Sequence, residues 1–495
     1  MTARALMLQG TGSDVGKSVL TAALCRIARR RGLSVAPFKP QNMSNNAAAC
    51  PTGGEIGRAQ ALQALACGLE PHVDFNPVLL KPETDRRAQL VVHGAAVGAM
   101  DAAHYMAHRG ELMDRVMESF DRLITAHDLV IVEGAGSPAE VNLRARDIAN
   151  MGFARRAGVP VCLIGDIDKG GVIASLVGTK AVLDTADASM ITSFLINKFR
   201  GDPALFDDGV TAIEEQTGWP CVGVIPWLTA TSQLPAEDAV VLDRPEPGRS
   251  VGLKIAAPML SRMANFDDAD ALKQEPGIDF IWVRPGQPIP RDADVIILFG
   301  TKSTIGDLEF LRQQGWEHDI IAHARTGGRV LGICGGYQML GQSISDKAGR
   351  DGDSGEAKGL GLLDVHTVMG ARKRVTPVNG QDTMSNAPVC GYEIHTGQTS
   401  GRDTDRAVFT LSEGPDGAQS EDGRIQGTYV HGAFSSDEFR REWIRRAGGE
   451  ADQTFNYHHG VIRALDALAD GVEAAVDIDA LLASAKRPGW RAYKA

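Results

Sequence analysis

A glycine-rich loop near the start of the chain has the residue types that hold a phosphate group. Gly10, Gly12 and Gly16 precede Lys17 and Ser18, between a short apolar run and a segment with apolar residues at helical spacing. Backbone amides of such a loop and the N-terminus of the following helix attract anions. The lysine then reaches the β- and γ-phosphates, and the serine ligates Mg²⁺. The loop therefore predicts nucleotide binding.

The spacing of this loop departs from the common G-x-x-x-x-G-K-[ST] pattern. Thr11 stands where the first glycine is usual, and Gly10 lies one position earlier. The alternative interpretation is a strand-to-helix turn that needs glycine only for its shape. Because strand, loop and helix occur in order, we expect the nucleotide to contact Gly10, Thr11, Gly12, Gly16, Lys17 and Ser18.

Polar residues also follow other predicted strands in the first half of the chain. Parallel sheets bind ligands at the carboxyl ends of their strands. Lys39 is thus a candidate second phosphate contact, and Glu133 a candidate Mg²⁺ ligand beside Ser18. Asn197 and Lys198 are candidate contacts to the nucleotide base. The alternatives are an ordinary exposed lysine and an acid that caps a helix.

A second chemical signal lies at Cys334, in a glycine-flanked turn from a predicted strand into a helix. Such a turn exposes a nucleophile, and the helix N-terminus favours the thiolate. The amide of Gly335 is placed to stabilise an oxyanion. His431, at the end of a later strand, is the candidate base. The alternative for Cys334 is a small buried apolar residue.

The elements around these residues predict an α/β protein with two doubly wound parallel sheets and helices on both faces. Strands are expected at residues 6–8, 33–38, 128–133, 159–164, 191–196, 221–225, 251–256, 278–283, 295–299 and 329–333. We expect a phosphate-loop domain over residues 1–235, a linker over 236–250, a cysteine domain over 251–446 and a helical C-terminal tail over 447–495.

Composition limits the possible partners. The 495 residues carry a net charge of −11, which argues against an extended nucleic-acid surface. No apolar run approaches the length of a membrane span, and the first residues lead straight into a strand, so we expect no membrane segment and no signal peptide. Seven scattered cysteines without C-x-x-C spacing are typical of the reducing cytoplasm.

Several local strings, taken together, resemble known families. Residues 10–18 and 132–136 resemble dethiobiotin synthetase, and residues 332–338 with His431 resemble class I glutamine amidotransferases. The combination in this order is similar to the cobyric acid synthase family of cobalamin biosynthesis, and the likeness weakens only over the last fifty or so residues. Further matching strings are 39–44 (KPQNMS), 165–168 (GDID), 196–202 (INKFRGD), 391–395 (GYEIH) and 427–432 (GTYVHG).

This resemblance implies a reaction. The family amidates the b, d, e and g carboxylates of adenosylcobyrinic acid a,c-diamide, with ATP and glutamine as co-substrates. The N-terminal domain would be the ATP-dependent amidoligase, in which Lys17, Lys39 and Mg²⁺ neutralise developing charge. Cys334 would form a glutamyl thioester with His431 as base and release ammonia. The small-molecule partners would be the corrinoid, glutamine and ATP. The oligomeric state stays open.

Two positions depart from the family patterns. Triad amidotransferases carry glutamate two residues after the histidine, where this chain has Ala433, so the group that orients His431 stays unidentified. The Leu-Pro-Gly-Ser-Lys loop reads Leu-Phe-Gly-Thr-Lys at residues 298–302. Gly300 keeps the position of an oxyanion-hole amide.

Three alternatives remain at this point. One is the sister enzyme, cobyrinic acid a,c-diamide synthase, which has the same two chemistries. Another is a partitioning-type ATPase, which would carry a signature lysine at the position of Gly12 and no cysteine domain. The third is a binding module whose amidotransferase half is inactive.

Overall fold

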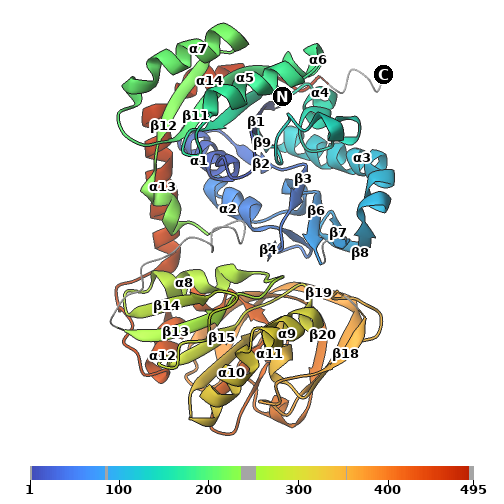
Figure 1. The fold of residues 1–495 in the computed structure, drawn as a ribbon, viewed down its shortest axis with the longest axis vertical. Helices are drawn as coiled ribbons and strands as arrows, with labels where there is room; N and C mark the ends of the chain where they lie inside the picture. The colour runs from blue at the N-terminus through green and yellow to red at the C-terminus, as the bar shows by residue number, and fades with distance from the viewer. Residues whose placement is uncertain (1–2, 84–86, 236–251, 353, 490–495) are drawn as a thin grey trace.

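The N-terminal lobe is built on a six-stranded parallel sheet. A computed structural model describes residues 3–83, 87–235, 252–352 and 354–489. Neighbouring strands in the order β12-β11-β10-β1-β9-β2 are all parallel (Figure 1). The predicted α/β fold is therefore confirmed for this lobe. The strands are β1 (Arg4–Gly10), β2 (Val35–Phe38), β9 (Leu129–Glu133), β10 (Val161–Asp166), β11 (Ile191–Phe199) and β12 (Cys221–Pro226).

Both faces of this sheet are covered, which explains the continuous apolar runs in the sequence. Along β1, Leu6 and Leu8 face one hydrophobic cluster with α1, and Met7 faces another cluster with Phe120 and Phe153. All three β1 side chains are fully buried. The helices of the lobe are α1 (Lys17–Arg30), α2 (Arg58–Cys67), α3 (Ala102–Ala126), α4 (Met151–Ala157), α5 (Val172–Val182), α6 (Thr185–Ala188) and α7 (Asp207–Thr217).

Two small sheets lie on the side of this lobe that faces the other lobe, and the sequence did not predict them (Figure 1). One has the order β3-β6-β7-β8, and the other pairs β4 with β5. Their strands are β3 (Gln41–Met43), β4 (Ala47–Ala49), β5 (Glu55–Gly57), β6 (Val78–Pro82), β7 (Arg87–Val92) and β8 (Ala95–Asp101).

The C-terminal lobe has a second six-stranded sheet, β14-β13-β15-β16-β24-β23, parallel except for its last pair. Beside it lies a mostly antiparallel sheet that the sequence did not predict, dominated by β19 (His366–Asp382) and β20 (Pro388–Ser400). The strands of the first sheet are β13 (Leu253–Pro258), β14 (Ile278–Val283), β15 (Val295–Leu298), β16 (Arg329–Ile333), β23 (Ala418–Gln419) and β24 (Ile425–Thr428). The other strands of the antiparallel sheet are β17 (Ser343–Asp346), β18 (Gly355–Lys358), β21 (Phe409–Leu411), β22 (Gly414–Asp416) and β25 (Val430–His431). The helices of this lobe are α8 (Asp270–Gln274), α9 (Thr304–Gln313), α10 (Trp316–Arg325), α11 (Gly335–Leu340) and α12 (Asp437–Arg446).

The last helices return to the N-terminal lobe. The helix α13 (Tyr457–Ala475) begins beside α12 and runs along both lobes, red in Figure 1, and α14 (Ile478–Ser484) follows it. Ion pairs join α1 to α13, with Arg26 2.8 Å from Asp466 and Arg30 2.6 Å from Asp470. The predicted linker over residues 236–250 lies outside the described residues.

A buried carboxylate joins the two lobes. Glu55 of β5 is fully buried and lies 2.8 Å from Nζ of Lys81 in the same lobe. It also pairs with Lys373 of β19, whose ammonium donates to Gln89 at 2.9 Å. Burial raises the pKa of Glu55, but the two ammonium groups outweigh it and hold the pKa at about 2.

Replacing Glu55 with glutamine is expected to destabilise the protein, because it removes the carboxylate that both lysines contact. Breaking a buried ion pair costs about 3–5 kcal/mol. A carboxylate with a lowered pKa stabilises the folded protein at pH values above its ordinary pKa of 4.5. This stabilisation is lost as the pH falls toward the lowered pKa of about 2. The thermal midpoints of wild type and Glu55→Gln should therefore differ most between pH 4.5 and about 7, because burial lowers the pKa of Lys373 to about 7, and they should converge below pH 4.5. The control is Glu118→Gln, which removes the carboxylate of the exposed Arg115–Glu118 ion pair. Equal midpoints of wild type and Glu55→Gln at neutral pH would contradict the expectation.

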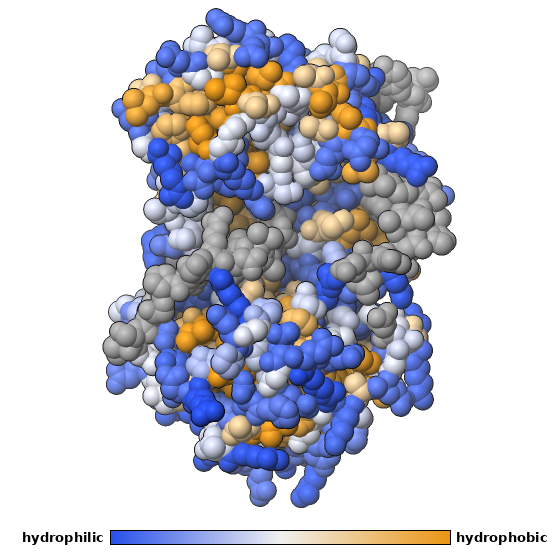
Figure 2. Space-filling view, viewed as in Figure 1, coloured by the Kyte–Doolittle hydropathy of each residue, from blue (hydrophilic) through white to orange (hydrophobic). Residues whose placement is uncertain are grey.

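The outer surface shows apolar residues mainly on the upper lobe of Figure 2, over α5 and α7. Val182 of α5 is 50% exposed, and Leu205, which precedes α7, is 82% exposed. Among the described residues, no helix is both long enough and apolar enough to cross a membrane.

Candidate active sites

The phosphate loop connects the end of β1 to the start of α1. Lys17 is buried, and its Nζ donates to Gly12 O at 2.9 Å and to Gly136 O at 3.1 Å. Gly16 has φ +100°, and a Cβ there would lie 2.3 Å from Nδ2 of Asn197. A Cβ on Gly10 would lie 2.4 Å from Val15. The loop therefore requires glycine at both positions for its compact shape.

The remaining loop residues differ in their surroundings. A Cβ on Gly12 would meet no atom within 4 Å, so the loop has open space at this point. The amide of Thr11 donates to Ile164 O at 2.9 Å and is thus engaged within the sheet. Because this amide already has a partner, it does not support the predicted contact of Thr11 with a nucleotide. That contact stays a prediction.

Glu133 brings together the polar residues of the loop and of neighbouring strands. It ends β9, which is paired in register with β1 and β2, and it is fully buried. Its Oε1 accepts from Ser18 Oγ at 2.6 Å and from Lys39 Nζ at 2.8 Å. Its Oε2 accepts from Gln63 Nε2 at 2.6 Å. The predicted residues Ser18, Lys39 and Glu133 thus meet at one point.

This arrangement fits a divalent cation. Mg²⁺ prefers oxygen ligands and binds through one or two carboxylates together with phosphates. The hydroxyl of Ser18 lies 2.6 Å from the carboxylate of Glu133, and Ser18 directly follows Lys17 at the start of α1. The residues predicted to hold Mg²⁺ are therefore suitably placed for it.

Asn197 and Lys198 lie behind the phosphate loop, at the end of β11. Nδ2 of Asn197 donates to Val15 O at 2.8 Å. Nζ of Lys198 pairs with Asp166 at 2.7 Å and donates to the carbonyl of Asp14. Both side chains therefore brace the loop backbone. Their contact with a nucleotide base stays a prediction.

Cys334 occupies the turn between β16 and α11. Its φ of +54° and ψ of −108° are unusual for a residue with a side chain, and such strain is common at nucleophile turns. A Cβ on Gly336 would lie 1.9 Å from Leu298 O, so the turn packs directly on the end of β15. The amide of Cys334 donates to Thr428 O at 2.8 Å, which ties the turn to β24.

His431 lies next to Cys334 and is held by an aspartate that the sequence did not reveal. The imidazole lines the same pocket as Cys334, whose Sγ donates to Ile394 O at 3.6 Å, and Nδ1 of His431 lies 2.7 Å from Oδ2 of Asp268. The other oxygen of Asp268 accepts from the amide of Gly432 at 2.5 Å. Asp268 belongs to the 3-10 helix η6 (Phe266–Ala269) and precedes the histidine by 163 residues. It fills the orienting role that Ala433 cannot perform.

The surroundings of His431 favour its charged form. Burial lowers the pKa of His431, but the Asp268 carboxylate and the hydrogen bond to Cys334 outweigh it and raise the pKa to about 10. Tyr392 stacks on the imidazole with ring centres 5.4 Å apart. An imidazolium beside the sulfur supports a thiolate nucleophile.

Two glycines border the reacting sulfur. A Cβ on Gly300 would lie 3.2 Å from His431 and 3.7 Å from Cβ of Cys334. A Cβ on Gly335 would lie 2.6 Å from the methyl group of Thr301. Phe299 points away into the core against Trp282, with ring centres 5.4 Å apart. Both glycines line the same pocket as Cys334, so their backbone lies where a substrate oxyanion would form.

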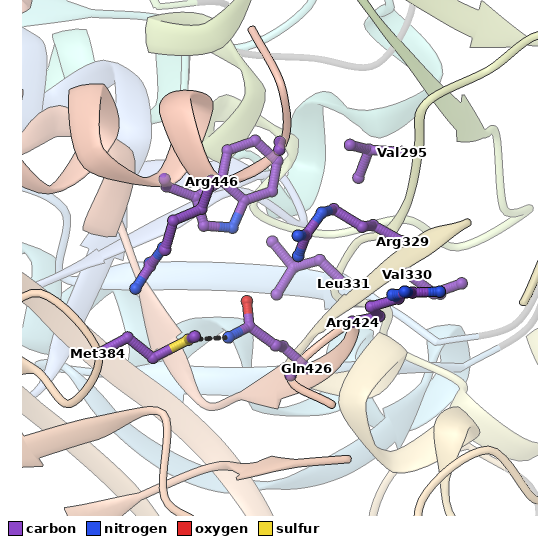
Figure 3. Close-up of a pocket in the computed structure, with 11 residues that line it drawn as sticks. Val295, Arg329, Val330, Leu331, Met384, Arg424, Gln426 and Arg446 are labelled. Atoms are coloured by element: carbon purple, nitrogen blue, oxygen red, sulfur yellow. Dashed lines mark hydrogen bonds between the residues drawn. The ribbon is translucent and has the colours of Figure 1, made fainter. Parts of the chain in front are cut away.

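The pocket at Cys334 opens toward the other lobe. Its lining includes Lys302, Asp351 and His395 of the C-terminal lobe together with Lys81 of the N-terminal lobe. Figure 3 shows a different pocket, in which Val295 and Arg329 lie at the amino ends of β15 and β16. Cys334 follows the carboxyl end of β16, so the pocket of Figure 3 is separate from the cysteine site.

Comparison with known proteins gives full-length similarity. Two family models match, the CobQ/CobB/MinD/ParA nucleotide binding domain at residues 6–241 and the CobB/CobQ-like glutamine amidotransferase domain at residues 254–439. A cobyric acid synthase of Hyphomonas neptunium is 64% identical over 99% of both chains. Those of Paracoccus denitrificans and Brucella suis are 61% and 57% identical, over 97% and 98% of this chain and 100% of theirs.

Proposed function

Because this chain belongs to the cobyric acid synthase family of cobalamin biosynthesis, we propose that it amidates the b, d, e and g carboxylates of adenosylcobyrinic acid a,c-diamide. It is an amide-forming ligase with a nucleotide-binding domain and a glutamine amidotransferase domain. The observation that carries the proposal is the pairing, in one chain, of the Glu133 cluster with the Cys334, His431 and Asp268 triad. The seven free cysteines agree with the cytoplasmic location predicted for this reaction.

In the proposed first half-reaction, the Cys334 sulfur attacks the side-chain amide carbon of glutamine. The carbonyl oxygen becomes an oxyanion that the amides at Gly335 and Gly300 stabilise. His431 then gives its proton to the departing nitrogen, and ammonia leaves a glutamyl thioester. Water hydrolyses the thioester to glutamate and frees the sulfur. Asp268 keeps the imidazole in the correct orientation and stabilises its charge.

In the proposed second half-reaction, an oxygen of the corrinoid carboxylate attacks the γ-phosphorus of ATP and ADP leaves. Lys17 and Lys39 neutralise the charge that develops on the transferred group. Ser18 and Glu133 would hold Mg²⁺, and the bound ion would add to the charge neutralisation at the phosphates. Ammonia attacks the carbonyl carbon of the resulting acyl phosphate, phosphate leaves, and an amide forms.

Replacing Asp268 with asparagine is expected to lower kcat for glutamine hydrolysis by about 10²–10⁴-fold, because a triad histidine loses its tautomer and orientation. The pKa of His431 should fall without the carboxylate that raises it, so the alkaline limit of the activity should move to lower pH. Ammonia-dependent amidation should be unchanged. The measurement is glutamate release across pH, with the exposed Asp422→Asn as control. An unchanged kcat in Asp268→Asn would remove Asp268 from the triad.

Product analysis tests the proposed substrate. The protein is incubated with adenosylcobyrinic acid a,c-diamide, ATP, Mg²⁺ and glutamine, and the corrinoid products are identified by mass spectrometry. We expect four replacements of hydroxyl by amide. If the a,c-diamide is left unchanged while cobyrinic acid gains two amides, the chain is instead the sister diamide synthase.

A further inference from the structure

The helix α2 of the N-terminal lobe contacts η6, the short helix of the other lobe that carries Asp268. Its first residue, Arg58, forms an ion pair across the interface with Asp267, at 2.9 Å between Nε and Oδ2. Asp267 directly precedes Asp268, the partner of His431, in the short helix η6. The amide of Arg58 donates to Asn46 O at 3.1 Å, which fixes the start of α2.

A second contact holds η6 from the same side. The amide of Ala47 in β4 donates to Oδ1 of Asn265, the residue that caps η6, at 3.1 Å. Nδ2 of Asn265 donates in turn to the hydroxyl of Tyr392 at 3.4 Å, and Tyr392 stacks on His431. The position of η6 therefore depends on two residues of the N-terminal lobe, Arg58 and Ala47.

The charge balance in η6 also depends on Arg58. Asp267 and Asp268 are both buried, and Oδ1 of Asp267 accepts no hydrogen bond among the described residues. Burial raises the pKa of Asp267, and the guanidinium of Arg58 counteracts this. A buried carboxylate without its cation protonates or moves toward water, and either change would disturb the adjacent Asp268.

We propose that Arg58 is a positioning residue of the glutaminase site, supplied by the synthetase lobe, which holds η6 so that Asp268 stays aligned with His431. The alignment of the glutaminase triad, whose three residues all lie in the C-terminal lobe, thus depends on a contact with the N-terminal lobe. This inference rests on the proposed function of Cys334 and His431 and adds a residue that lies outside the amidotransferase domain.

A second residue of α2, Gln63, provides a control for the test of Arg58. Gln63 lies about 7.5 Å further along α2, at 1.5 Å per residue, and donates to Glu133 at 2.6 Å. A change at Arg58 that disturbed all of α2 would therefore also disturb the phosphate-loop site. Ammonia-dependent amidation reports on that site without using the triad.

The test measures glutamate release from glutamine by the full-length protein. Arg58→Gln is expected to lower kcat about 10–100-fold, with KM for glutamine within about threefold, because a misplaced catalytic group mainly slows the chemical step. Arg58→Lys should recover part of the loss. Ammonia-dependent amidation should stay within about twofold of wild type, and the exposed Arg115→Gln should behave as wild type.

The double variant Arg58→Gln/Asp267→Asn separates charge compensation from packing. Removing both charges leaves no unpaired charge at the Arg58–Asp267 contact, so kcat should exceed that of Arg58→Gln alone. A wild-type kcat in Arg58→Gln, a change confined to KM, or a double variant no faster than Arg58→Gln would each overturn the proposal. These readouts concern glutamine hydrolysis alone, so they are distinguishable from a failure of the corrinoid assignment, which appears in the wild-type products.

Discussion

Replacing Cys334 with alanine is expected to abolish glutamine-dependent amidation while ammonia-dependent amidation continues. The thiolate is the nucleophile of the first half-reaction, and loss of a nucleophile in such a site costs at least about 10⁴-fold in rate. The phosphate-loop site shares no residue with the Cys334 turn, so free ammonia should still reach an activated carboxylate. The measurement is amide formation with glutamine or with an ammonium salt as nitrogen source.

The matched control for this variant is Cys390→Ala, which removes an exposed cysteine of β20 in the same lobe. It should keep both activities. If Cys334→Ala loses amidation with ammonia as well as with glutamine while remaining folded, the separation into two reaction sites is wrong.

Replacing Lys17 with alanine is expected to remove amidation with either nitrogen source, by about 10³-fold or more. The lysine provides a buried positive charge beside the loop carbonyls of Gly12 and Gly136, where developing phosphate charge must be neutralised. Glutamate release should persist within about tenfold, because the triad in the other lobe is untouched. The assays are corrinoid amidation with ammonia and glutamate release with glutamine.

Two further variants sharpen this result. Lys17→Gln keeps a hydrogen-bond donor but no charge, so it should be nearly as inactive as Lys17→Ala if charge is what matters. Lys347→Ala removes an 82% exposed lysine and should retain wild-type activity. Ammonia-dependent amidation at the wild-type rate in Lys17→Ala would exclude the phosphate loop from carboxylate activation.

The phosphate-loop cluster was largely predictable because its residues follow buried strands. The carboxyl ends of parallel strands meet at one edge of a sheet, so Lys39 after β2 and Glu133 at the end of β9 had to approach the loop after β1. Gln63 was not predictable, since a glutamine within a helix carries no local signal of its partner. Its contact with Glu133 depends on how α2 packs beside α1.

Asp268 was missed for a related reason. It lies in a single 3-10 turn among other acids, and acidic residues at the start of a helix usually need no functional explanation. Only the folded lobe brings η6 to the end of β25, where His431 lies. The departure at Ala433 did indicate that some other group must orient the histidine.

The antiparallel sheet of the C-terminal lobe was missed because its long strands are half exposed. Burial along β19 does not alternate regularly, and its pairing with β20 shifts register between Met369 and Arg374. Regular alternation is the pattern that reveals such strands in a sequence. Lys373, within this irregular stretch, is the residue that reaches Glu55 across the interface.

The most direct test of the account follows the nitrogen from one site to the other. The wild-type protein is incubated with adenosylcobyrinic acid a,c-diamide, ATP, Mg²⁺ and glutamine labelled with ¹⁵N in its side-chain amide, and the corrinoid product is analysed by mass spectrometry. We expect a product with four new amides that carry ¹⁵N from the wild-type protein, and no labelled amide when Cys334 is replaced with alanine. New amides without label, or labelled amides formed by the Cys334→Ala variant, would contradict it.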